Sequence, residues 1–121
     1  MELAYFGKAY HGWQRQPNAV SVQEVVENSL SLLLQQSIEV TGAGRTDTGV
    51  HARQLFAHFD IEEPLEENFQ FRINSLLPKD VAVLGIFEVK QEAHARFDAV
   101  ARSYEYHIVC NKNVFFLDTA Y

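Results

Sequence analysis

The 121-residue sequence has a single cysteine, three prolines and no long hydrophobic run. One thiol, that of Cys110, excludes an intramolecular disulfide and cannot form a zinc site of several cysteines, which favours a reducing, cytoplasmic location. The longest apolar runs, such as Leu32–Leu34 and Val81–Leu84, are far too short to cross a bilayer. Because the first residues also lack the profile of a signal peptide, we expect a soluble protein without a membrane segment.

Basic residues are also scarce. Ten lysines and arginines stand against 16 acidic residues, which gives a net charge of −6 and argues against nucleic-acid binding by bulk electrostatic attraction. Hydrophobic residues make up 47% of the chain, enough for a packed interior, so intrinsic disorder is not expected. The length, without repeats or a linker, predicts one domain or one half of a larger one, spanning residues 1–121.

Periodic patterns predict two helices and several strands. Ser21 and Glu24 have the spacing of a capping box, in which the serine caps the start of a helix. Val81–Val89 is apolar at both odd and even positions as far as Phe87, which predicts a strand in the centre of a sheet. The mixture favours an α+β fold, a mostly antiparallel sheet with both helices on one face. The predicted strands are Met1–Phe6, Arg53–Asp60, Val81–Val89 and Val100–Val109, the helices Val22–Gln36 and Leu65–Leu76, and the long loops Lys8–Asn18 and Thr41–Gly49.

Residues 42–52 form the segment richest in chemically active side chains, with an arginine, an aspartate, two threonines and a histidine among glycines. Arg45 and Asp47 are two apart, so in an extended run they would project to the same side, as a charged pair over a cleft. A tight surface turn, in which Asp47 only makes a local hydrogen bond, explains the same composition. The loop by itself leaves both interpretations open.

Two common motifs fit this loop poorly. A phosphate-binding loop would need Gly-Lys-Ser/Thr after a buried strand, and Ser37–Val40 is short and polar. Asp47-Thr48-Gly49 matches the triplet of aspartic proteases, in which two carboxylates share a proton. Arg45 would instead hold Asp47 ionised, which opposes proton sharing.

The whole string from Gly44 to Ala52 resembles the catalytic signature of the bacterial tRNA pseudouridine synthase A family. Segments similar to other motifs of that family follow the same order along the chain: Tyr10–Gln14, Ser21–Glu24, Asn74–Val81, His94–Phe97 and Arg102–Tyr106. Several collinear motifs are far more specific than any triplet.

The resemblance implies a ferredoxin-like or RRM-like half of a pseudouridine synthase, with Asp47 as the catalytic residue. It leaves open whether Asp47 acts as a nucleophile or as a base. Arg45 would fill the gap left by a flipped base, and Tyr104 would stack on the uracil. Without the resemblance, Tyr104 and Tyr106 are typical core residues of an alternating strand. The reaction involves no redox change, so neither a cofactor nor a metal is expected.

The substrate implied by the resemblance is the tRNA anticodon stem-loop, modified at uridines 38 to 40, and the full-length enzyme would be a homodimer. The sequence ends at Tyr121, soon after the predicted tyrosine-bearing strand, whereas the family pattern continues for about as many residues again. We therefore expect residues 1–121 to be the N-terminal half, inactive alone. The competing interpretation is a non-catalytic RNA-binding module in which Tyr104 and Tyr106 stack bases and Asp47 only shapes a turn.

Overall fold

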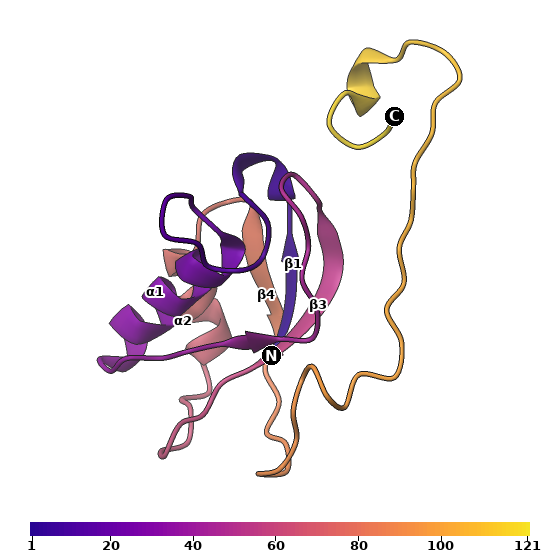
Figure 1. The fold of residues 1–121 in the computed structure, drawn as a ribbon. Coiled ribbons are helices and arrows are strands. Elements are labelled where there is room, and N and C mark those ends of the chain that lie inside the picture. The colour runs from indigo at the N-terminus through magenta and orange to yellow at the C-terminus, as the bar shows by residue number, and fades with distance from the viewer.

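Four strands form one antiparallel sheet in the computed structural model, which describes all 121 residues (Figure 1). Along the sheet the order is β2-β3-β1-β4, and two helices cover one face. This order in a βαββαβ chain is the ferredoxin-like topology. The α+β prediction, with both helices on one face, is therefore confirmed. The elements are β1 (Glu2–Tyr5), α1 (Val22–Leu34), β2 (Thr41–Gly42), β3 (Ala52–His58), α2 (Phe69–Leu76), β4 (Val81–Gly85) and two short 3-10 turns, Gly7–Ala9 and Val114–Phe116.

Helix α1 begins where its capping signal predicts. The Ser21 hydroxyl accepts a hydrogen bond from the Glu24 amide at 3.3 Å, which satisfies one of the free donors of the first turn. The helix ends at Leu34, before the predicted Gln36, because Gln35 adopts a left-handed conformation with φ 54°. Neither α1 nor α2 has the length and apolarity needed to span a bilayer.

Helix α2 begins at Phe69, later than the predicted Leu65. Leu65 packs against the core from the irregular segment before the helix, so it extends the helical pattern without belonging to the helix. A turn separates Leu65 from α2, since the Phe69 amide donates to the Glu66 carbonyl at 3.0 Å.

The prediction that Val81–Val89 lies centrally is wrong, because β4 is an edge strand and ends at Gly85. Its free edge is occupied by a side chain of α2 rather than by another strand. The Asn74 amide donates to the Val83 carbonyl at 2.9 Å, and the Val83 amide donates to the Asn74 side-chain oxygen at 2.8 Å. Helix α2 thus satisfies the backbone amide and carbonyl of Val83, which would otherwise pair with a neighbouring strand.

Part of the predicted Thr41–Gly49 loop pairs with the sheet. Thr41 and Gly42 form the short edge strand β2, opposite His58 and Ala57 of β3. The loop proper therefore starts at Ala43.

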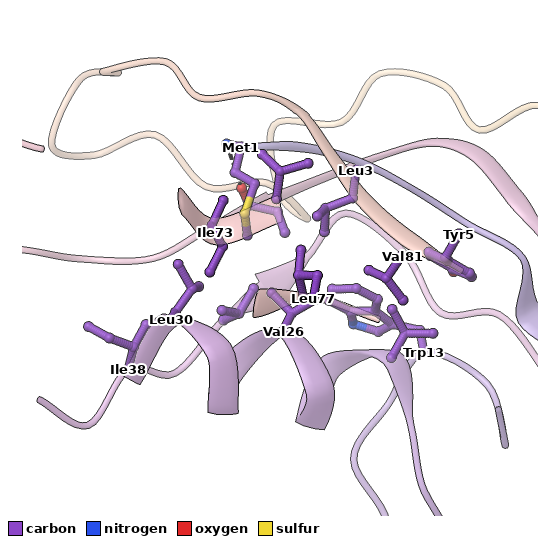
Figure 2. Packing of buried hydrophobic residues seen from close by; sticks show 14 of the residues in the cluster. Met1, Leu3, Tyr5, Trp13, Val26, Leu30, Ile38, Ile73, Leu77 and Val81 are labelled. Carbon is purple, nitrogen blue, oxygen red and sulfur yellow. Dashed lines mark hydrogen bonds between the residues drawn. The ribbon is translucent and has the colours of Figure 1, made fainter. Parts of the chain in front are cut away.

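The hydrophobic core lies between the sheet and the two helices (Figure 2). Leu3, Leu30 and Ile73 are fully buried there and come from β1, α1 and α2. Trp13, from the loop that precedes α1, lies near Tyr5 and Val81 at one end of this core. The loop is thus anchored to the core by its tryptophan.

The predicted strand Val100–Val109 is not part of the sheet. Figure 1 shows this segment running past the sheet, apart from its strands, toward the C-terminus. Its end folds back on itself, since the Val109 amide donates to the Tyr121 carbonyl at 2.7 Å. Tyr106, predicted to be a core residue, is 80% exposed. The segment pairs with neither edge strand of the sheet, β2 or β4, and an alternating pattern forms a strand only where it is paired.

Candidate functional site

The loop between β2 and β3, which carries Asp47, is held against the first strand and the segment that follows it. The Trp13 amide donates to the Thr46 carbonyl at 3.1 Å, and the Gly49 amide donates to the Tyr10 carbonyl at 3.2 Å. The hydroxyls of Tyr5 and Thr46 share a hydrogen bond of 2.8 Å. Three contacts to residues distant in sequence therefore fix this loop.

Gly12 allows the two segments to approach closely. Its φ is +80°, and a Cβ atom built there would lie 2.3 Å from the Thr46 carbonyl oxygen. Only glycine combines that backbone conformation with that separation. The Asp47 loop thus rests directly on the backbone of the Tyr10–Gln14 segment.

Asp47 has a fixed backbone and an exposed side chain. Its carbonyl accepts a hydrogen bond from the Val50 amide at 3.2 Å, which closes a turn with Gly49 at φ +80° in its third position. The backbone closes this turn without the carboxylate, which takes part in none of the ion pairs of the chain. The carboxylate is therefore available to a ligand.

Arg45 is likewise exposed and is not ion-paired with Asp47. Thr46 lies between them and directs its hydroxyl to the buried Tyr5. With the middle residue turned inward, the guanidinium and the carboxylate are left on the outer surface of the loop. They are separate polar groups rather than a charged pair.

His51 fixes the far end of the loop. Its Nδ1 accepts from the Gly7 amide at 2.8 Å, and its ring stacks on Phe6 with centroids 4.0 Å apart. Its Nε2 lies 2.6 Å from the Asp118 carbonyl oxygen, which can only accept, so the partners assign the proton to Nε2. His51 thus ties the loop to the residues that follow β1 and to the C-terminal segment.

Tyr104 lies on the unpaired C-terminal segment and is 66% exposed, so it is not the core residue that its alternating pattern alone predicts. Its segment is tied to the loop by Arg102, whose Nε donates to the Ala43 carbonyl at 2.9 Å and whose Nη2 donates to the same oxygen. No hydrogen bond joins Tyr104 to Asp47 or Arg45. The structure therefore brings the two segments together through Arg102.

Comparison with known proteins identifies the family of this chain. The family model described as tRNA pseudouridine synthase matches residues 3–98. The chain belongs to the tRNA pseudouridine synthase family. It is 52% identical over 112 residues to a tRNA pseudouridine synthase A of Bacteroides fragilis, covering 91% of this chain and 44% of that protein. Proteins of the same name from Azobacteroides pseudotrichonymphae and Porphyromonas gingivalis are 50% and 47% identical over 93% of this chain, which covers 46% of each. The chain thus spans about half the length of these relatives.

Within this tRNA pseudouridine synthase domain, a second polar region lies away from the Asp47 loop. A cavity of about 670 Å³ is lined by side chains of α1 and of the segment leading to β2. Glu27 is buried beside it, pairs with Arg15 at 2.6 Å and accepts a hydrogen bond from the Val40 amide at 2.9 Å. These contacts hold the chain leading to β2 against α1. No group of three or more His, Cys, Asp or Glu side chains is arranged to hold a metal ion.

Proposed function

We propose that residues 1–121 are the N-terminal half of a tRNA pseudouridine synthase that converts uridines 38 to 40 of the tRNA anticodon stem-loop into pseudouridine. Membership of the family and the name shared by the relatives support this proposal. The observation that carries it is the state of Asp47, whose backbone is fixed while its carboxylate is exposed and unpaired. A carboxylate in this state is available to act on a ligand and is not used to hold the fold together.

The chemistry assigned to Asp47 follows from the reaction. Isomerisation breaks the bond between uracil N1 and ribose C1′, turns the base, and joins C5 to C1′, so the C5 hydrogen is released and N1 gains one. The Asp47 carboxylate either attacks the ribose or the uracil base as a nucleophile, or removes the 2′ proton of the sugar. All of these roles need an ionised carboxylate next to the target nucleoside, and none needs a redox group.

Arg45 and Tyr104 are proposed to hold the substrate open. Extruding a base from a stem costs a few kcal/mol, and the Arg45 guanidinium would occupy the space it leaves. The exposed ring of Tyr104 would stack on the uracil, worth about 1–3 kcal/mol. Support comes from the exposure of both side chains and from the link that Arg102 makes between their segments.

The net charge of −6 means that this half cannot hold tRNA by bulk attraction. We propose that shape and a few arginines supply recognition, in a cytoplasmic homodimer of the full-length enzyme. The exposure of both Tyr104 and Tyr106 favours one alternative, a non-catalytic module that stacks single-stranded bases on this segment.

A chimaera tests the proposal, in which residues 1–121 replace the matching segment of the Bacteroides fragilis relative. Its substrate is tRNA tritiated at uridine C5, because isomerisation releases that tritium into water. We expect the chimaera to release tritium, with pseudouridine mapped to positions 38 to 40, and the 121-residue chain alone to release none. A folded chimaera that binds tRNA without releasing tritium would favour the RNA-binding module, and pseudouridine only at other positions would refute the assigned site.

A further inference from the structure

Thr46 is the most constrained residue of the Asp47 loop. Its side chain shares a 2.8 Å hydrogen bond with the Tyr5 hydroxyl, and its carbonyl accepts from the Trp13 amide at 3.1 Å. The backbone of Gly12 packs against the same carbonyl. Side chain and backbone of Thr46 are thus held at once, while Arg45 and Asp47 on either side are exposed.

The partner of Thr46 is itself rigid. Tyr5 is the last residue of β1, where it pairs with Ala52 of β3 and Val81 of β4, and it is only 4% exposed. Its ring stacks near that of Trp13, with centroids 6.3 Å apart (Figure 2). Burial raises the pKa of the Tyr5 hydroxyl above its ordinary value, so the hydroxyl stays protonated at neutral pH. The contact therefore runs from the centre of the sheet to the loop.

We propose that the Tyr5 and Thr46 hydroxyls form a positioning pair that sets the direction of the Asp47 carboxylate and the Arg45 guanidinium. The inference rests on the function proposed above for Asp47. A hydroxyl at position 46, turned inward and bonded to the sheet, fixes which way its two neighbours face. Because a displacement of about 1 Å at a reacting group can reduce the rate by about 100-fold, a single hydrogen bond next to the carboxylate has a large effect on turnover.

Four variants of the chimaera separate this role from a structural one. Thr46→Val keeps the branched shape and removes the hydroxyl, and Thr46→Ser keeps the hydroxyl. Tyr5→Phe removes the other partner. Thr119→Val is the matched control, because Thr119 is exposed, lies outside the Gly44–Ala52 string and has a hydroxyl that makes no hydrogen bond within the chain. Urea unfolding of each variant confirms that it is folded under the assay conditions.

We expect Thr46→Val and Tyr5→Phe each to lower kcat about 10- to 100-fold, with KM for tRNA changed less than about twofold. Thr46→Ser should retain most of the activity and Thr119→Val all of it. The Thr46→Val/Tyr5→Phe double variant should be no slower than either single variant, because both remove the same contact. Unchanged kcat in Thr46→Val, or an equal loss in Thr46→Ser, would overturn the positioning role.

The same variants of the 121-residue chain give a readout that needs no catalysis. The backbone amide order parameter of Asp47 should fall from about 0.85 toward about 0.6 in Thr46→Val and stay high in Thr119→Val. An unchanged order parameter in Thr46→Val would refute the pair even if the chimaera were inactive. An inactive wild-type chimaera with the expected loss of order would refute the proposed function and leave the pair standing.

Discussion

Gly12 and Gly49 offer a matched test of how the Asp47 loop is supported. Both have φ +80°, but a Cβ at Gly12 would lie 2.3 Å from the Thr46 carbonyl oxygen, whereas a Cβ at Gly49 would meet nothing within 4 Å. Alanine in a left-handed conformation costs roughly 1–2 kcal/mol at either position. At Gly12 the overlap adds roughly 1–3 kcal/mol, because backbone on both sides must move.

We therefore expect Gly49→Ala to lower the free energy of unfolding by about 1–2 kcal/mol and Gly12→Ala by about 2–5 kcal/mol. Equilibrium urea unfolding measures both, with the fluorescence of Trp13 as the probe, since it is the only tryptophan and is 3% exposed. At a typical slope of about 1–3 kcal/mol per molar urea, the two midpoints should differ by about 1 M. Equal losses in the two variants would refute close packing of the Asp47 loop on Gly12.

Two further predictions concern parts of the fold that support the site. Glu27→Ala should lower the free energy of unfolding by about 2 kcal/mol, because the Val40 amide loses its buried acceptor. Glu27→Gln should lower it less, because an acceptor remains. Equal losses for the two variants in urea unfolding would contradict this. Burial, followed by the nearby His94, lowers the pKa of His58 below its ordinary 6.5. The unfolded chain then binds the proton more tightly, so stability should fall as the pH drops below 6.5, and His58→Gln should reduce that dependence. An unchanged pH slope of the urea midpoint in His58→Gln would contradict the assignment.

The sequence predicted best those elements whose signals are local. Helix α1 follows from a serine cap and from apolar residues at helical spacing, and both are properties of consecutive residues. β1 and β3 follow from short apolar or alternating runs that end at polar or turn residues. The fold class could be predicted because helices and strands are mixed along the chain with at least two successive strands, which favours an α+β fold over regular βαβ alternation.

Features that depend on distant partners were predicted poorly. The apolar residues of β4 indicated a central strand, but Asn74 of α2 occupies its outer edge, and no local pattern in β4 reveals that contact. The alternation of Val100–Val109 predicted a strand, although this segment pairs with neither edge of the sheet. Periodicity reports which faces of a segment are apolar and cannot report what lies against them.

At the site, composition identified the Asp47 loop but not its support. Three glycines and several polar side chains in a row are visible in the sequence, whereas Tyr5, Gly12 and Trp13 reach the loop from more than 30 positions away. The Gly12-Trp13 pair within the first similar motif was the only available signal. The close contact between Gly12 and the Thr46 carbonyl depends on the φ of Gly12, and residue identity alone does not give that angle.

The central claim, that Asp47 does the chemistry on a rigid loop, is tested most directly by Asp47→Asn in the chimaera. Asparagine keeps the size of the side chain and cannot act as a carboxylate nucleophile or base. Tritium release from tRNA should fall to background, while tRNA binding and the urea midpoint stay at wild-type values. Tritium release at or near the wild-type rate from this folded variant would contradict the account.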